Sequence, residues 1–328
     1  MYSDLDERAL WEYRSAAEEP EDFDAFWWRT LAETSPHPID LSLAPVDCGL
    51  QTVAAWDVHF RGFGGQPIAG WLLLPATEDA QLPGVVQYLG YGAGRGNPLD
   101  HLLWPSAGYA TLVMDTRGQG SGNNAGVTPD PVGSGPAFPG QLTRGVNHPD
   151  DYYYRRVYVD AVRAVDAIMA HPRVDSSHLF VTGGSQGGGI ALAVAALRDD
   201  VAGLAAHVPF LCDLRRASVL TDQLPYKELA RYLATHRAQV DRVFHTLSYF
   251  DGVNLAKRAN APALFSTALM DATCPPSTVF GAFHNYAGPK SITVWPYNGH
   301  EGGEVEDRMR ALALFNQLRL SPREVSAA

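Results

Sequence analysis

Apolar and polar positions alternate in blocks along most of the chain, and the blocks follow two different periods. Short runs rich in Val, Leu and Ile indicate buried strands, and longer segments with apolar residues three and four positions apart indicate helices. Because the two kinds of segment take turns, we expect an α/β fold with a mostly parallel central sheet and helices on both faces. The alternating segments are Tyr154 to Ala170, Leu179 to Thr182, Gly187 to Leu197, Leu204 to Val208, Ala263 to Ala268, Val279 to Tyr286 and Ile292 to Trp295.

The N-terminal part of the chain adds an extension and further strands to this core. Pro20 to Glu33 opens with acidic residues and spaces its aromatic side chains for one helical face, which predicts an amphipathic helix within an extension of about 50 residues. The strands expected next are Ala55 to Arg61 and Ile68 to Leu74, which resemble an antiparallel hairpin, then Val85 to Leu89 and Thr111 to Met114.

Two segments interrupt the alternation. Residues 116–151 are rich in Gly, Pro and Asn and are too long for an ordinary connection, so we expect a functional or interface loop. Residues 213–250 have an amphipathic, charge-mixed pattern that predicts a helical insertion, placed where a lid would cover a site. The chain contains no internal repeat, and we expect one domain over residues 1–328.

Composition and net charge restrict the classes of partner that the protein can bind. Hydrophobic residues make up 46% of the 328 residues, enough for a sizeable core, and the formal net charge is -11. This charge repels phosphate backbones and anionic lipid surfaces, so we expect neither nucleic acid nor membrane as a partner. The start of the chain lacks a basic, apolar leader and no stretch is long enough to span a bilayer, which favours a cytoplasmic protein.

The sequence predicts no metal and no cofactor. Cys48, Cys212 and Cys274 are too widely spaced for a zinc motif or a disulfide framework, which fits a reducing compartment. The histidines form no HxH or HExxH pair. The glycine loops at 90–96 and 118–122 lack the full GxGxxG spacing and open no helix, so we also exclude a dinucleotide site.

The strongest chemical signal is Gly183-Gly184-Ser185-Gln186-Gly187, which lies between a strand-like run and a helix-like run. A GxSxG motif in this context predicts the nucleophile elbow of an α/β hydrolase. The alternative is a glycine-rich turn with an exposed serine. A serine nucleophile needs a base and a group that orients the base, so two partners must be found.

Chain order supplies both partners. Asp271 follows the strand-like Ala263 to Ala268, although its position alone fits a helix N-cap equally well. His300 follows the last strand-like run, where a base is expected, and the alternative is a loop histidine that caps a turn. The order Ser185, Asp271, His300 is the order of α/β hydrolases, which favours the catalytic interpretation of all three.

An acyl-transfer site also needs oxyanion donors and a pocket for the alcohol. We expect the backbone N–H groups of Gln186, directly after the nucleophile, and Tyr91, in the loop after Val85 to Leu89, to be the donors. Pro209 and Phe210, together with the lid segment from Asp213 onward, are expected to shape the alcohol pocket, and Tyr91 is expected to contact substrate as well.

The motifs resemble those of carbohydrate esterase family 7, the acetyl xylan esterases and cephalosporin-C deacetylases, within the α/β-hydrolase superfamily. The resemblance runs through nearly the whole chain. The residues that carry it are Asp22-Phe-Asp-x-Phe-Trp27, Arg117-Gly-Gln-Gly120, Gly183-Gly-Ser-Gln-Gly-Gly188, Phe250-Asp-Gly-Val-Asn254, Asp271-x-x-Cys-Pro-Pro276 and His300-Glu301.

The resemblance implies deacetylation of acetylated xylo-oligosaccharides and other small esters, cephalosporin C among them, and in some members perhydrolysis. It also implies a homohexamer, with residues 116–151 in assembly contacts and with Arg117 and Gln119 as scaffold residues. One departure concerns the oxyanion loop: the family carries a His-Gly pair before the tyrosine, and here the pair is Leu89-Gly90.

Two other functions compete with an esterase. A serine peptidase of the prolyl-oligopeptidase type shares the elbow and the chain order, but that family carries a large N-terminal propeller and only about fifty residues precede the first predicted strand here. A non-catalytic binding protein could keep the fold and lose the reaction. The complete Ser, Asp and His set argues against the second alternative.

Overall fold

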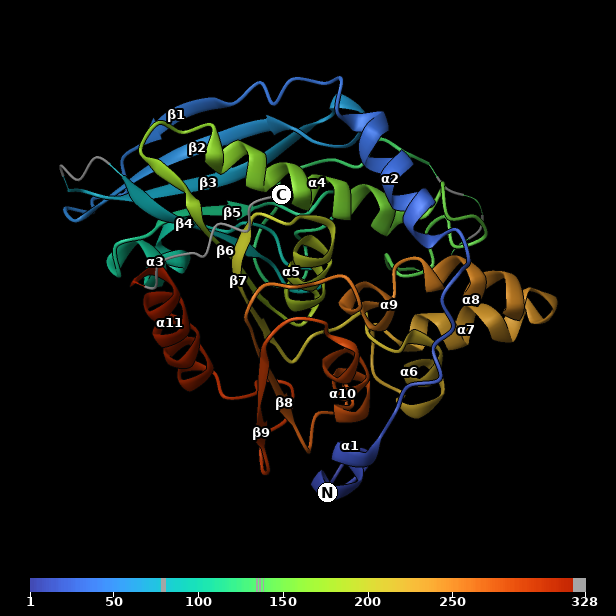
Figure 1. The fold of residues 1–328 in the computed structure, drawn as a ribbon. Coiled ribbons are helices and arrows are strands. Elements are labelled where there is room, and N and C mark those ends of the chain that lie inside the picture. The colour runs from blue at the N-terminus through green and yellow to red at the C-terminus, as the bar shows by residue number, and fades with distance from the viewer. Residues whose placement is uncertain (78–80, 134, 136, 138, 321–328) are drawn as a thin grey trace.

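The computed structural model describes residues 1–77, 81–133, 135, 137 and 139–320, and within them nine strands form one sheet (Figure 1). In chain order the strands are β1 (Ser42–Val46), β2 (Val53–Arg61), β3 (Pro67–Pro75), β4 (Leu82–Tyr88), β5 (Ala110–Met114), β6 (Val174–Gly184), β7 (Val201–His207), β8 (Ala263–Ala268) and β9 (Lys290–Trp295). They lie in the order β1-β2-β3-β5-β4-β6-β7-β8-β9. The strands from β5 to β9 in this order are parallel, which confirms the predicted mostly parallel sheet.

The hairpin prediction is also confirmed, because β2 and β3 pair antiparallel, with Val53 opposite Pro75 and Arg61 opposite Pro67. β1 was not predicted. It pairs antiparallel with β2 at the edge of the sheet, and most of its residues are exposed. An edge strand with no buried face carries no apolar alternation, and its Pro45 argues against a strand in sequence alone.

Helices lie against both faces of the sheet (Figure 1). Successive residues of a strand point to opposite faces, so on β6 Phe180 packs in one apolar cluster and Val181 in the other. The Val181 face holds the larger cluster, with α4, α5 and α10, and the Phe180 face is covered by α3 and α11. These helices are α3 (Leu103–Ser106), α4 (Tyr153–Met169), α5 (Gln186–Leu197), α10 (Pro276–Asn285) and α11 (Val305–Leu320).

The N-terminal extension crosses to the far end of the molecule through α1 (Glu7–Glu12) and α2 (Phe23–Thr34). The predicted amphipathic helix is α2, and its buried Trp27 donates a hydrogen bond to the carbonyl of Tyr249 (2.9 Å). Closer to the chain start, the Ser3 hydroxyl donates to the backbone carbonyl of Asp271 (2.7 Å). The extension therefore packs against segments that lie more than 200 residues away in sequence.

The two interrupting segments differ in structure. Residues 213–250 contain α6 (Leu214–Leu220), α7 (Lys227–Thr235) and α8 (Val240–Ser248), so the helical insertion is confirmed, and α9 (Gly252–Ala256) follows it. The described part of 116–151 contains no helix or strand, and residues 134, 136 and 138 of that predicted loop lie outside the described residues. Buried Arg117 anchors its start through two bonds to Asp160 on α4 (2.5 and 2.7 Å).

The described helices were also compared with what a bilayer requires. None of them combines the length and the apolar character that a membrane span needs.

Candidate active site

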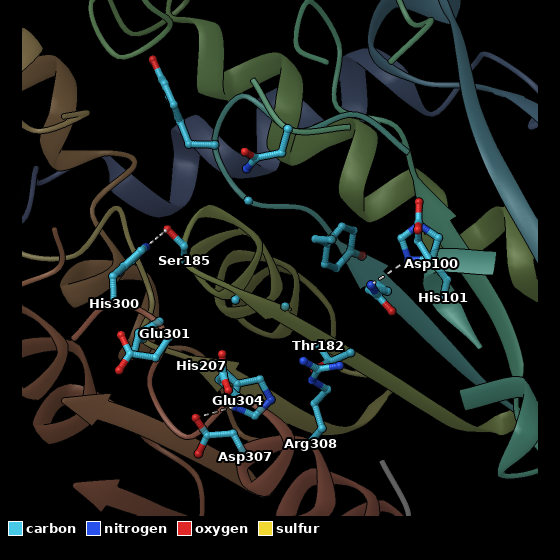
Figure 2. Close-up of a pocket in the computed structure, with 18 of the residues that line it drawn as sticks. Asp100, His101, Thr182, Ser185, His207, His300, Glu301, Glu304, Asp307 and Arg308 are labelled. Atoms are coloured by element: carbon cyan, nitrogen blue, oxygen red, sulfur yellow. Dashed lines mark hydrogen bonds and ion pairs between the residues drawn. The ribbon is translucent and has the colours of Figure 1, made fainter. Parts of the chain in front are cut away.

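A cavity of about 860 Å³ opens over the carboxyl ends of β4, β6 and β7, and Ser185 and His300 lie in its wall (Figure 2). The two side chains point toward each other from loops that are 115 residues apart in the chain. Open α/β sheets bind ligands at the carboxyl ends of their strands. The site is therefore where the predicted topology requires it.

Ser185 occupies the turn between β6 and α5, with φ 55° and ψ -122°. Positive φ is strained for a residue with a side chain. The flanking glycines make the turn possible: a Cβ on Gly183 would lie 2.3 Å from the carbonyl carbon of Gly187, and a Cβ on Gly187 would lie 2.2 Å from the carbonyl oxygen of Tyr88. The backbone N–H of Ser185 donates to the carbonyl of His207 on β7 (2.9 Å), which fixes the elbow to the next strand.

The structure brings the three residues identified by chain order into one hydrogen-bonded series. His300 Nε2 lies 2.9 Å from Ser185 Oγ, and His300 Nδ1 lies 2.9 Å from Asp271 Oδ2. Asp271 is fully buried, and its Oδ1 accepts from the backbone N–H groups of Thr273 and Cys274 (2.8 Å each). These bonds hold the carboxylate in one orientation, so the imidazole can place its proton on Nδ1 and accept the serine proton on Nε2.

Asp271 and His300, with buried Cys274, are also the described residues whose side-chain atoms lie close enough to hold a metal ion, all within 4.8 Å of one another. Both ring nitrogens of His300 are already engaged by Ser185 and Asp271. The donor set is therefore explained by proton transfer, and the prediction of no metal and no cofactor stays as it was made.

The Gln186 backbone begins α5, where N–H groups and the helix dipole favour negative charge. Its side chain is fully buried, and its Oε1 accepts from Tyr154 (2.8 Å) and from Gln119 Nε2 (2.9 Å). Gln119 Oε1 in turn accepts from the backbone N–H of Gly92, next to Tyr91 (2.6 Å). One glutamine thus connects the two loops that carry the expected oxyanion donors, a function that its interpretation as a scaffold residue did not specify.

Tyr91 lies on the cavity wall, and its hydroxyl is directed at the 213–250 insertion. It donates to Glu228 Oε1 on α7 (2.7 Å) and accepts from the backbone N–H of Gln141. Burial raises the pKa of Glu228 to about 7, and burial together with the charge of Glu228 raises the pKa of Tyr91. The phenol of Tyr91 therefore stays protonated and acts as a structural donor.

Leu89, the residue that departs from the family pattern, is buried, and its carbonyl accepts from Gln186 Nε2 (3.2 Å). The contact uses the backbone, so it does not depend on the leucine side chain.

The structure gives the two expected alcohol-pocket residues a different position. Phe210 is fully buried and packs its ring against Tyr91 and Tyr226, with ring centres 6.0 and 4.5 Å apart, and neither Pro209 nor Phe210 lines the cavity. Their neighbour Val208 does, with Leu224 and Pro225 of the insertion. Nothing local in the sequence marks Leu224 or Pro225 as site residues.

Comparison with known proteins agrees with this geometry. The family profile described as acetyl xylan esterase (AXE1) matches residues 1–317. The acetyl esterase Axe7A of Xylanibacter ruminicola is 30% identical over 292 residues, which cover 86% of this chain and 63% of that protein. The chain thus spans less than two thirds of the length of this curated relative.

Two solved structures resemble the fold closely. An acetyl xylan esterase from Paenibacillus sp. R4 is 38% identical with a TM-score of 0.89, covering 94% of this chain and 99% of that one. Acetyl xylan esterase 1 from Thermoanaerobacterium sp. JW/SL YS485 is 32% identical with a TM-score of 0.89, covering 96% and 99%.

Proposed function

This chain belongs to the acetyl xylan esterase family, and from that membership and the site geometry we propose that it is a serine carboxylesterase. Its substrates are acetylated xylo-oligosaccharides and other small acetyl esters, cephalosporin C among them. The observation that carries the proposal is the series Asp271, His300, Ser185, with both hydrogen bonds at 2.9 Å, in the wall of a cavity large enough for a small ester.

The reaction proceeds through an acetyl-enzyme. His300 accepts the proton of Ser185 as Oγ attacks the acetyl carbonyl, and Asp271 stabilises the imidazolium that forms. His300 then protonates the departing alcohol, and water attacks the acetyl-enzyme with His300 again as the base. The backbone N–H groups of Gln186 and Tyr91 stabilise the oxyanion in both steps, each by about 3 kcal/mol.

Two features of the structure support these donors. The Gln186 N–H lies at the first turn of α5, and the loop of Tyr91 is tied to it through Gln119. Donors fixed in advance need no reorganisation during the reaction, which is the source of their catalytic effect.

The remaining parts of the proposal concern assembly and location. The chain acts as one α/β-hydrolase domain with a lid at residues 213–250, and six copies assemble with residues 116–151 at their contacts. It acts in the cytoplasm, which agrees with three free cysteines.

A panel of esters and one amide tests the activity. We expect hydrolysis of acetylated xylose and nitrophenyl acetate, weaker hydrolysis of the butyryl ester, and none of the octanoyl ester or a prolyl anilide. Cleavage of the anilide without acetyl hydrolysis would replace the esterase with the peptidase alternative. Inactivity toward every compound would favour a binding protein.

A further inference from the structure

One face of the central sheet carries polar side chains that line the same cavity as Ser185. Gln87 on β4 and Thr182 on β6 are register partners. Thr182 also pairs with Ala205 on β7, and His207 lies two residues further along that strand, so Gln87, Thr182 and His207 share one face. We call these three residues the polar row. All three line the cavity, and Figure 2 labels Thr182 and His207.

The polar row is unexpected for a sheet of this kind. Strands of a parallel sheet that is covered on both faces are normally apolar throughout. Earlier positions on the same face follow that rule, since Val85, Phe180 and Ala205 are buried in the cluster under α11. On β4, β6 and β7 the change from apolar to polar side chains on this face coincides with the start of the cavity lining.

Within the polar row, Gln87 and Thr182 have hydrogen-bonding groups that no described residue of the protein engages. His101 Nε2 lies 2.8 Å from the carbonyl of Arg95 and must donate there, so His101 Nδ1 accepts from Gln87 Nε2 (3.1 Å). This arrangement fixes the Gln87 amide and leaves its Oε1 as an acceptor. Within the described residues, no group hydrogen-bonds to that oxygen or to the Thr182 hydroxyl.

His207 lies next to the carboxylate of Asp307, which accepts its hydrogen bonds from other residues. Its Nδ1 is buried without a hydrogen-bond partner among the described residues, and the nearest Asp307 oxygen is 3.9 Å away. Burial lowers the pKa of His207, so the ring is neutral near pH 7. The negative charge of Asp307 favours the proton on Nδ1, which leaves Nε2 as the ring atom that accepts.

Asp307 itself is immobilised. Its carboxylate accepts from Ser266 Oγ (2.7 Å), Trp295 Nε1 (3.0 Å) and the backbone N–H of Gly303 (2.9 Å). The orientation of His207 is therefore set by the scaffold. In addition, the His207 carbonyl is the acceptor for Ser185 N–H, so the row is fixed relative to the nucleophile.

We infer that the polar row is a leaving-group subsite that binds the alcohol part of polyhydroxylated esters in preference to simple alkyl esters. A sugar hydroxyl both donates and accepts, and the row offers acceptors at Gln87 Oε1 and His207 Nε2 and a hydroxyl at Thr182. The cavity volume of about 860 Å³ exceeds what an acetyl group needs and lies within the range of small-molecule sites. This inference rests on the proposed esterase function.

The test compares two acetyl esters that differ in the alcohol, a monoacetylated pentose and ethyl acetate. The quantity measured is the ratio of their kcat/KM values, pentose ester over ethyl ester. Thr182→Val removes one hydroxyl and keeps the shape, so we expect the ratio to fall about three- to tenfold, the range for one neutral hydrogen bond. Thr182→Ser keeps the hydroxyl and should keep the ratio within about twofold.

A matched control is available on a neighbouring strand. Thr267 on β8 is fully buried, its hydroxyl has no partner within the described residues, and it does not line the cavity, so Thr267→Val should leave the ratio unchanged. A ratio that Thr182→Val does not change, or that Thr267→Val lowers equally, would overturn the inference. Failure of the wild-type protein to hydrolyse either ester would instead overturn the proposed function.

Discussion

The carboxylate of Glu228 accepts a hydrogen bond of 2.7 Å from the hydroxyl of Tyr91, and this contact ties the 213–250 insertion to the loop that follows β4. The second oxygen of Glu228 accepts from the backbone N–H of Leu142 (2.9 Å) in the long 116–151 loop. Three segments that are separate in sequence thus meet at one buried carboxyl group beside the cavity.

The burial of Glu228 predicts a pH-dependent stability. Burial raises the pKa of Glu228 from 4.5 to about 7, so the folded protein favours the neutral acid. The contribution of Glu228 to the stability of the folded protein is therefore complete below about pH 4.5 and is lost as the pH rises toward 7. Glu228→Gln is neutral at every pH, and the wild-type Tm minus the variant Tm should fall between pH 5 and 7. Thermal unfolding at a series of pH values measures this difference, and a difference that stays constant would contradict the prediction.

The elbow predicts a sharp contrast between the two glycines Gly184 and Gly187. Gly187→Ala places a Cβ 2.2 Å from the carbonyl oxygen of Tyr88, so the strand and helix must separate, and we expect a loss of about 3 kcal/mol or more in the free energy of unfolding. Gly184→Ala is the control, since the nearest atom to its Cβ is 4.0 Å away, and it should cost less than about 1 kcal/mol. Urea unfolding of both variants decides, and equal losses would show that the close approach at Gly187 is not the constraint.

Gln119 predicts a kinetic effect without direct contact with substrate. Its amide joins Gly92 N–H to the Gln186 side chain, so Gln119→Met should loosen both oxyanion loops and lower kcat on nitrophenyl acetate about tenfold or more, with a small change in KM. Gln141→Met is the matched control, because that side chain bonds elsewhere: it donates to the carbonyl of Gly118 (3.1 Å) and accepts from Arg144 Nη1 (2.9 Å). A change in KM alone would mean that Gln119 does not position the donors.

Two buried threonines should respond oppositely to loss of the hydroxyl. Thr267 Oγ1 has no partner within the described residues, so Thr267→Val removes an unsatisfied group and should raise the free energy of unfolding or leave it unchanged. Thr278 Oγ1 donates to the carbonyl of Pro275 (2.7 Å), so Thr278→Val should lower the free energy of unfolding by about 1 kcal/mol. Denaturant titration of both variants tests the pair, and a larger loss for Thr267→Val would contradict it.

The nucleophile elbow and the order of Ser185, Asp271 and His300 along the chain could be predicted from short sequence patterns. The glycines around Ser185 mark the elbow because strand and helix must approach within a few ångströms there, and chain order then located Asp271 and His300, which the structure brings within hydrogen-bond distance. The parallel sheet followed from alternating strand and helix patterns in the same way.

The remaining site residues depend on contacts that no local pattern records. Glu228 reaches Tyr91 across 137 residues, and the polar row forms only because strand register sets β4, β6 and β7 side by side. The turn after β7 shows the same limit: positive φ at Val208 (39°) and Leu211 (66°) accompanies a fully buried Phe210, which sequence had assigned to the pocket. Backbone conformation of this kind has no signal in residues that are not glycine.

The central claim is that Ser185 is the nucleophile of an acetylesterase, and the most direct measurement is kcat/KM on acetylated xylose for the wild type and Ser185→Ala. We expect the substitution to lower kcat/KM by a factor of about 10⁴ or more while the protein stays folded, because the rest of the site cannot form the acetyl-enzyme. A Ser185→Ala protein that keeps kcat/KM within about tenfold of the wild type would contradict the account.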